Sequence, residues 1–222
     1  MIMFISIAID GPAAAGKSTV AKIVAKRLGY VYIDTGAMYR AFTYAVIKAG
    51  LDPKDEGASC SLIGKVDIEL TEDGRVFCNG EDVSKPIREN EVSSNVSYIA
   101  SYKAIRLELI KLQRDLAAKQ NVVMDGRDIG SYVLPNAQVK IFQIASVETR
   151  AKRRYDENLS KGIKTSLEEV EANVRQRDYI DSHRDFDPLM KDKDAVELDT
   201  SAMSIDEVVE AILSITKEKL GA

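Results

Sequence analysis

Residues 11–18 read Gly11-Pro12-Ala13-Ala14-Ala15-Gly16-Lys17-Ser18, and this stretch decides the fold of the chain. It has the form G-x-x-x-x-G-K-S, follows an apolar run at residues 2–9 and precedes an apolar-periodic segment at residues 18–28. A strand, a glycine-rich loop and a helix in this order form a phosphate site, because main-chain N–H groups and the helix N-terminus point at the anion. An ordinary glycine turn explains the stretch less well, since every fixed position of the motif is present.

We therefore predict that residues 11–19, ending at Thr19, bind the phosphates of a nucleoside triphosphate. The Lys17 ammonium group would contact the β- and γ-phosphates, and the Ser18 hydroxyl group would contact Mg²⁺. The motif predicts binding of the nucleotide but does not say which reaction follows.

The composition is that of one α/β domain. Of the 222 residues, 45% are hydrophobic and 30% are charged, and the net charge is −4. A net negative chain has no bulk basic field, so we expect neither a nucleic acid nor a membrane as partner. Cys60 and Cys78 lack C-x-x-C spacing, and His183 is the only histidine that could be a further zinc ligand, which argues against a zinc site. The run at residues 2–9 is too short for a signal peptide or a membrane span, so we expect a cytoplasmic protein. We also expect it to be a monomer.

The pattern beyond the loop predicts a parallel sheet of about five strands flanked by helices. Helices are expected at residues 18–28 and 37–48, over most of 91–119, and from the capping residues Ser146, Ser166 and Ser204. Further strands are expected at residues 30–33, 121–124, 138–144 and 195–198. The polar breaks at Gly11, Asp34 and Asp125 then fall at the carboxyl ends of strands, where nucleotides bind.

The hydrophobic pattern changes between about residues 60 and 92. Residues 66–70 alternate with a period of two, and the pairs Asp73-Gly74 and Asn79-Gly80 provide turns on either side of a strand at 75–78. This predicts a small antiparallel insertion. The pattern alone fits equally well an insertion that carries a second substrate and a hairpin without function.

Arginines suggest a second phosphate site. A net acidic chain that collects guanidinium groups near a phosphate loop is expected to use them on phosphoryl oxygens, which they bind bidentately. The arginines in question are Arg40, Arg127, Arg150, Arg153, Arg154, Arg175, Arg177 and Arg184. Solvated helix faces would explain Arg153 and Arg175 equally well. Several arginines in one chain, with no N-K-x-D motif, favour a small kinase with a lid at about residues 155–165 over a switch or a motor.

Three acceptors remain open from the residues alone. A nucleoside monophosphate needs no catalytic base, because its phosphate is already mostly a dianion near pH 7. A sugar or shikimate kinase would need a carboxylate near the acceptor hydroxyl group, and Asp34 could supply it. A regulatory protein that slowly hydrolyses ATP or GTP would use no acceptor other than water.

Several segments together resemble the bacterial cytidylate kinases, in the nucleoside monophosphate kinase group of P-loop kinases. The resemblance covers essentially the whole chain, and it is carried by residues 9–19, 34–40, 80–84, 87–88, 125–130, Ser97 with Arg106, Arg177-Asp178 with Asp181 and Arg184, and Pro188-Leu189. It implies one P-loop kinase domain over residues 1–222, with a monophosphate-side insertion at about 60–92 and a lid at about 155–165. A kinase that prefers UMP or dTMP remains the nearest alternative.

The resemblance also implies an activity and its residues. The γ-phosphoryl group of ATP would pass to CMP or dCMP with Mg²⁺, giving CDP or dCDP and ADP. Ser97, Arg106 and Asp128 would read the cytosine, and Arg177 with Asp181 would contact the sugar. Arg40, Arg127 and Arg184 would hold the monophosphate. Lys17, Arg127, Arg150, Arg154 and Arg184 would act in catalysis, and Arg150, Arg153 and Arg154 would face the transferring phosphate. Thr35, which stands where the family often has serine, and Tyr39 are further substrate contacts.

Overall fold

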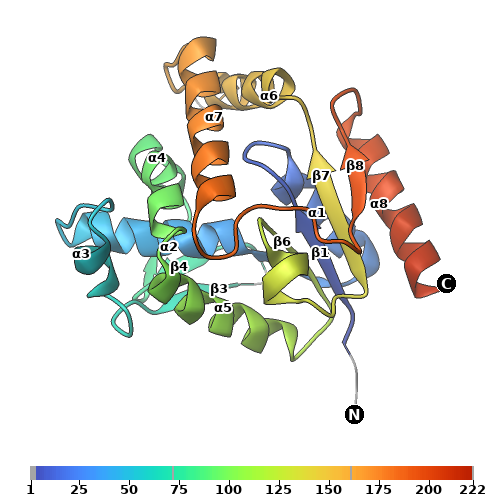
Figure 1. Cartoon of the computed structure of the whole chain (residues 1–222), viewed down its shortest axis with the longest axis horizontal. Helices are drawn as coiled ribbons and strands as arrows, with labels where there is room; N and C mark the ends of the chain where they lie inside the picture. Colours follow the sequence, from blue (N-terminus) through green and yellow to red (C-terminus); the bar gives the residue numbers. More distant parts are fainter. Residues whose placement is uncertain (1–3, 72, 161, 222) are drawn as a thin grey trace.

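A five-stranded parallel sheet forms the centre of the computed structural model, which describes residues 4–71, 73–160 and 162–221. The strand order is β2-β6-β1-β7-β8. The strands are β1 (Ser6–Asp10), β2 (Val31–Asp34), β6 (Val122–Gly126), β7 (Val139–Ile144) and β8 (Val196–Asp199) (Figure 1). The expected parallel sheet of about five strands is thereby confirmed, and the strand that precedes the phosphate loop lies at its centre.

Each face of the sheet is buried against helices. Ile7 and Ile9 of β1 pack with α1 (Lys17–Leu28) and α8 (Ile205–Leu220), whereas Ala8 belongs to the core formed with α2 (Thr35–Lys48) and α5 (Lys103–Ala117). Successive residues of a strand point to opposite faces, so a strand covered on both sides is apolar throughout. This explains why Ile7, Ala8 and Ile9, directly before the phosphate loop, are all apolar.

The register brings the polar strand ends together. Asp34 of β2 lies opposite Asp125 of β6, and Asp10 of β1 lies opposite Gly126. Helix α2 begins at Thr35, two residues before the predicted start, because Asp34 caps it by accepting a hydrogen bond from the Ala37 N–H at 2.7 Å. The carboxyl ends of the three neighbouring strands therefore form one polar edge, as predicted.

The segment after α2 contains a second, antiparallel sheet. It has three strands, β3 (Ile68–Leu70), β4 (Val76–Cys78) and β5 (Glu81–Asp82), between the short helices α3 (Glu56–Cys60) and η1 (Pro86–Arg88). The sequence pattern identified the first two strands, whereas β5 has only two residues and no alternation to reveal it. Buried Ile68, Val76 and Cys78 pack in the same core as α2, so this sheet is anchored to the main domain.

The helical region predicted over most of residues 91–119 consists of two helices, α4 (Asn90–Ile99) and α5. A turn after Ala100 separates them, and the main-chain N–H of Arg106 in the first turn of α5 donates to the Tyr102 carbonyl oxygen. A π-helix, η2 (Ile129–Val133), follows β6, which no sequence signal predicted. Both features place side chains near the polar edge of the sheet.

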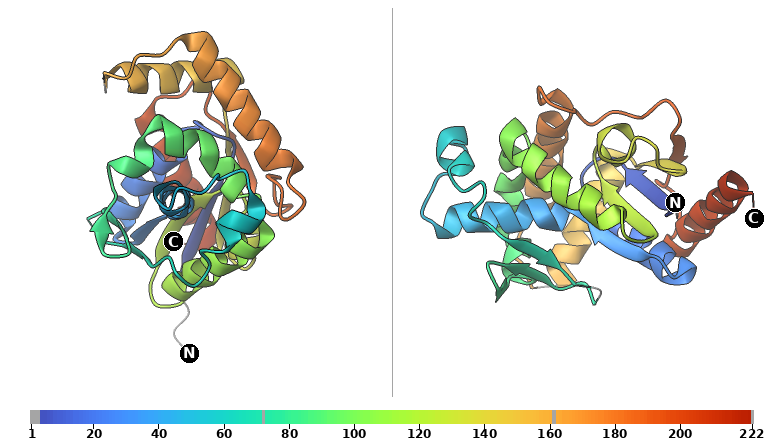
Figure 2. Two further views of the ribbon diagram at one scale, coloured as in Figure 1. Left: turned by 90° about the vertical axis from the view of Figure 1, so that its left-hand side faces the viewer. Right: turned by 90° about the horizontal axis from the view of Figure 1, so that it is seen from below.

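Helices α6 (Val147–Ser160) and α7 (Leu167–His183) form an arch above the carboxyl ends of the strands (Figures 1 and 2). Ala151, Val170 and Val174 make a small core between them, and the predicted capping box of Ser166 and Glu169 starts α7. The predicted lid lies where the two helices meet, although its residue Lys161 lies outside the described part of the chain. Within the described ranges, no helix is long and apolar enough to cross a membrane.

Candidate active site

A cavity of about 700 Å³ follows the polar edge of the sheet. One end lies against the start of α8 at Ser204, and the other end reaches Ser97 of α4 and Arg106 of α5. The phosphate loop and the arch of α6 and α7 line its middle. One continuous cavity thus connects the predicted donor site to the predicted acceptor site.

The phosphate loop is fixed by close backbone packing. Gly11 has a φ of 147°, and a Cβ atom there would lie 2.0 Å from the carbonyl oxygen of Gln143 in β7, so only glycine fits. The Gln143 side chain donates to the Ala15 carbonyl oxygen at 2.6 Å. The Lys17 ammonium donates at 2.7 Å to the carbonyl oxygens of Gly11 and Pro12. Burial, together with the positive charge of Arg127, lowers the pKa of Lys17, which a bound polyphosphate would oppose.

Ser18 and Asp125 form an oxygen pair beside the loop. The Ser18 hydroxyl donates to Asp125 Oδ2 at 2.8 Å, and the Tyr32 hydroxyl donates to Asp125 Oδ1 at 2.8 Å. Burial, and then the nearby Asp34 carboxylate, raises the pKa of Asp125 to about 6. A hydroxyl and a carboxylate are the hard oxygen ligands that Mg²⁺ prefers, so the pair fits a magnesium ion that also binds phosphate and water. The sequence identified Asp125 only as a strand end, because its contact with Ser18 depends on β6 lying beside β1 in the folded sheet.

Four arginines from different elements gather in the middle of the cavity. Arg40 of α2 lies 3.1 Å from Asp34, and Arg88 of η1 lies 3.4 Å from the same carboxylate. Arg127, which follows β6, pairs at 2.7 Å with Asp181 of α7. Burial, and then the neighbouring Arg127, lowers the pKa of Arg177 to about 10, so this guanidinium group stays charged at neutral pH. This concentration of positive charge is suited to a phosphate dianion.

The far end of the cavity holds a fully buried arginine. Arg106 donates to the Ala100 carbonyl oxygen at 3.1 Å and to Asp128, and its guanidinium carbon lies 5.8 Å from the Tyr39 ring centroid. Arg184 Nη2 lies 3.3 Å from Asp128 Oδ1. Arg184 was predicted to bind the monophosphate group. In the structure it lies beside Asp128, at the end of the cavity that was predicted to bind the cytosine base.

Asp10 is a buried carboxylate beside the phosphate loop that does not line the cavity and that the sequence pattern did not single out. It accepts hydrogen bonds from the main-chain N–H groups of Ile129 at 2.8 Å and Gly130 at 2.7 Å, and so holds the start of η2 directly after Asp128. Burial raises the pKa of Asp10 to about 7. Residues 119 and 120 positions away in the sequence supply these donors, which explains why no local pattern pointed to them.

Most predicted site residues line this one cavity. They are Ala14, Ala15, Gly16, Lys17, Ser18, Thr19, Thr35, Tyr39, Arg40, Ser97, Arg106, Arg127, Asp128, Arg153, Arg154, Arg177, Asp181 and Arg184. Thr35 is buried and donates to the Asp125 carbonyl oxygen at 2.6 Å. Arg154 pairs with Glu157 at 3.0 Å, and Arg153 donates to the Thr200 carbonyl oxygen at 2.6 Å.

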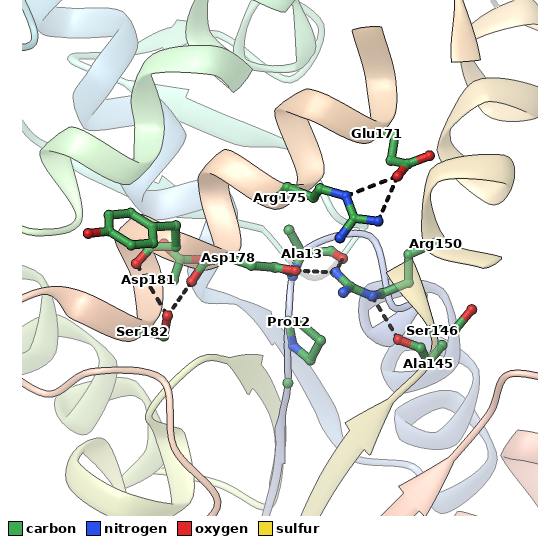
Figure 3. A network of polar contacts seen from close by, with 12 residues as sticks. Pro12, Ala13, Ala145, Ser146, Arg150, Glu171, Arg175, Asp178, Asp181 and Ser182 are labelled. Atoms are coloured by element: carbon green, nitrogen blue, oxygen red, sulfur yellow. Dashed lines mark hydrogen bonds and ion pairs between the residues drawn. The ribbon is translucent and has the colours of Figure 1, made fainter. Parts of the chain in front are cut away.

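Arg150 lies apart from this cavity. It is buried against the outer side of the phosphate loop, where it donates to the carbonyl oxygens of Ala13 and Ala145 and pairs with Asp178 (Figure 3). The predicted loop residues Gly11, Pro12 and Ala13 also lie outside the cavity lining. Arg150 thus has protein partners for its guanidinium group, and its predicted role at the transferring phosphate stays a prediction.

Known proteins match the chain over almost its full length. The profile of the family described as cytidylate kinase matches residues 7–218. The cytidylate kinase of Bacillus subtilis (strain 168) is 54% identical over 97% of both chains, and that of Geobacillus sp. (strain WCH70) is 55% identical over 98% of both chains. A gluconokinase from Sinorhizobium meliloti 1021 has the same fold, with a TM-score of 0.52, 14% identity, and coverage of 98% of this chain and 94% of its own. The chain belongs to the cytidylate kinase family.

Proposed function

We propose that this protein transfers the γ-phosphoryl group of ATP to CMP or dCMP and so produces ADP with CDP or dCDP. Family membership supports this reaction. The observation that carries it is the single cavity that connects the phosphate loop to the Arg106–Asp128 pair. A donor and an acceptor bound at these two ends would meet at the arginines between them.

The donor end supplies groups for a triphosphate. Main-chain N–H groups of the loop and the Lys17 ammonium would hold the β- and γ-phosphates. Ser18 and Asp125 would hold Mg²⁺ together with phosphate oxygens and water. Such an ion neutralises charge that develops on the phosphate oxygens during transfer.

The acceptor end supplies positive charge without a catalytic base. The phosphate of CMP is mostly a dianion near pH 7, so it can attack the γ-phosphorus directly. Arg40, Arg127 and Arg177 would hold that phosphate and the sugar beside it. Asp34, which a hydroxyl kinase would use as a base, instead accepts hydrogen bonds from Ala37 and Arg40.

The base end favours cytosine over uracil. Asp128 would accept a hydrogen bond from the exocyclic amine of cytosine, while Arg106 and Ser97 would donate to its carbonyl oxygen and ring nitrogen. Uracil presents a carbonyl oxygen where cytosine has the amine, so the buried Asp128 would face a second acceptor. An unpaired buried polar group can reduce the use of the wrong substrate by up to about 10⁴-fold.

The arch of α6 and α7 would act as the lid. Arg154 lines the cavity from α6, and closure of the arch would bring it towards the phosphates while excluding water, which competes with the acceptor. We also propose that the enzyme works as a monomer in the cytoplasm. The free thiols of Cys60 and Cys78 fit a reducing compartment.

A coupled assay of ADP release across a panel of monophosphates tests the proposal. CMP and dCMP should give rapid turnover, UMP should be slower, and omission of the monophosphate should nearly abolish ADP release. Faster turnover of UMP than of CMP at equal concentration would contradict the roles given to Arg106 and Asp128. ADP release at the full rate without any monophosphate would indicate a hydrolase instead.

A further inference from the structure

The peptide groups of Ala13 are held from two directions. The Ala13 N–H donates to Asp178 Oδ1 at 3.0 Å, and the Ala13 carbonyl oxygen accepts from Arg150 Nη1 at 2.9 Å. Asp178 belongs to α7 and Arg150 to α6. Both helices of the arch therefore grip the outer turn of the phosphate loop (Figure 3).

The two gripping side chains also bind each other. Arg150 Nη1 lies 2.6 Å from Asp178 Oδ2, and Arg150 Nε donates to the Ala145 carbonyl oxygen at 2.9 Å. The Arg150 side chain is only 5% exposed. A buried, charge-assisted set of this kind fixes geometry because every partner orients the next. We call Asp178, Arg150 and the peptide groups of Ala13 the loop clamp.

The loop needs such support at this position. Ala14, the next residue, has a φ of 59°, a left-handed conformation that is unfavourable for any residue with a Cβ atom. Its side chain packs against the core of Ala151, Val170 and Val174 between α6 and α7. The peptide groups that follow Ala13 are those that would face the donor phosphates. Their orientation therefore depends on the clamp and on the arch behind it.

Helix α7 carries acceptor-side residues on both sides of Asp178. Arg177 precedes it directly, and Asp181, which pairs with Arg127, follows one turn later. A nucleotide that draws Arg177 and Asp181 towards it moves the same helical turn that holds the Ala13 N–H. The helix is thus in direct contact with both halves of the cavity.

We propose that Asp178 and Arg150 are positioning residues that couple the two nucleotide sites. CMP bound at the acceptor end fixes α7, α7 fixes the phosphate loop through the clamp, and the fixed loop binds ATP more tightly. This inference rests on the proposed function, since it requires that both nucleotides bind. Linkage makes the effect reciprocal, so bound ATP tightens CMP by the same factor.

Calorimetry on the whole protein with Asp178→Asn tests the coupling. The measured quantity is the ratio of dissociation constants for a magnesium complex of a non-hydrolysable ATP analogue without and with saturating CMP. In the wild type we expect a ratio of about 5 or more, in the usual range for coupled sites. In Asp178→Asn the ratio should fall to about 2 or less, because the amide cannot serve both Ala13 and Arg150 as the carboxylate does. Affinity for CMP alone should stay close to the wild-type value.

Arg175→Gln is the matched control. Arg175 lies on the same helix, is exposed, and pairs with Glu171 and Glu148 without reaching the phosphate loop (Figure 3). Its ratio should equal that of the wild type. If Arg175→Gln lowers the ratio as far as Asp178→Asn, general loosening of the arch explains the effect and the clamp does not.

Two results separate this inference from the proposed function. A wild-type protein that does not bind CMP contradicts the function itself. A wild type that binds both nucleotides, with an unchanged ratio in Asp178→Asn, overturns the coupling role alone. Should Asp178→Asn fail to fold, Arg150→Lys answers the same question, because lysine retains the charge but cannot reach Ala13, Ala145 and Asp178 together. A wild-type ratio in that variant overturns the proposal equally.

Discussion

At the scale of single residues, Arg127 joins the two halves of the cavity. It follows β6 directly and pairs with Asp181 of α7. It also lies near enough to Lys17 for its positive charge to lower the pKa of Lys17. Although burial opposes its charge, the Asp181 carboxylate raises the pKa of Arg127. The Arg127 guanidinium group is thus held by Asp181 while it lines the cavity, where the proposed function puts the acceptor phosphate.

We predict that Arg127→Ala weakens CMP binding by at least about 10-fold, the effect of losing one charge-assisted hydrogen-bonded contact. ATP binding should survive, because the phosphate loop and Ser18 are unchanged. Titration calorimetry with each nucleotide separately measures both affinities. Arg27→Ala, which removes an exposed arginine paired with Glu210, serves as the control. Unchanged CMP affinity in Arg127→Ala would remove this residue from the acceptor site.

Asp10 gives a prediction about pH. Its pKa is raised to about 7 by burial, so the protonated form is favoured in the folded state. Its contribution to stability is therefore complete below about pH 4 and is lost as the pH rises through about 7. Asp128 strengthens this rise, whereas Lys17 and the N–H groups of Ile129 and Gly130 oppose it. The Lys140 side chain lies close by, across Gly130.

Asp10→Asn should remove this titration. The free energy of unfolding of the wild type minus that of the variant should decrease from pH 5 to pH 8, by at most about 1.4 kcal/mol per pH unit. Urea unfolding at several pH values measures this difference. Asn121→Ala is a suitable control, because Asn121 also ties β1 to the start of β6 through its bond to the Ile5 N–H, but it does not titrate. A difference that is constant over this pH range would show that Asp10 stays ionised in the fold.

The roles that sequence reasoning identified follow from a local motif or from the family resemblance, whereas the roles it missed depend on contacts between distant segments. Lys17 and Ser18 belong to a contiguous motif, and Arg106 and Asp128 stand in segments with a family resemblance. Asp10, Asp125 and Asp178 also lie in segments with that resemblance, but their contacts are hydrogen bonds to residues 107 to 165 positions away. Such partners become neighbours only after the strands are ordered, so no periodicity or spacing could disclose them.

At the scale of elements, the helices begin where their capping residues predicted. Ser166 accepts from the Glu169 N–H at 3.1 Å, and the Glu169 carboxylate accepts from the Ser166 N–H at 2.9 Å. This capping box fixes the first turn of α7, at the end furthest from the sheet. The same box at Ser204 starts α8. The strand β5 and the π-helix η2 gave no comparable signal, because two residues cannot alternate and the first N–H groups of η2 donate to the distant Asp10 carboxylate.

Ser166→Ala should lower the free energy of unfolding by about 1 kcal/mol, the usual effect of losing a serine cap. The loss should be greatest near the cap, so amide hydrogen exchange of the first turn of α7 should accelerate more than exchange in β6. Thermal denaturation and hydrogen-exchange mass spectrometry measure the two effects. Ser166→Thr keeps a hydroxyl cap and should retain most of the stability. Equal losses in both variants would show that the cap does not hold α7.

At the scale of the whole molecule, the cavity is walled by elements from both ends and from the middle of the chain. The sheet edge, α2, α4, α5, η1 and the arch each contribute side chains to it. A ligand that contacts all of these parts at once stabilises the fold as a unit, since it binds the folded chain and not the unfolded one. The sequence predicted this meeting of elements from the shared carboxyl edge of parallel strands, but not the depth to which Arg106 is buried.

CMP at 100 times its dissociation constant should therefore raise the free energy of unfolding by about 2.7 kcal/mol. UMP at the same concentration should raise it by less, since Asp128 in its proposed role would face a second hydrogen-bond acceptor on uracil. Differential scanning fluorimetry with each nucleotide compares the two midpoints directly. AMP, whose purine base is larger, provides a further comparison. Equal midpoints with CMP and UMP would indicate that the base end does not discriminate.

The position of the arch between β7 and β8 has a consequence for how the molecule can be reshaped. These neighbouring strands run parallel, so the chain must travel back along the sheet between them, and α6 and α7 make that return. Deleting the arch would remove the connection between β7 and β8. The three-stranded sheet between α2 and α4 is an insertion that does not interrupt the central strands. The three-stranded insertion could therefore be shortened without interrupting the central strands. The arch could only be replaced by another connection between β7 and β8.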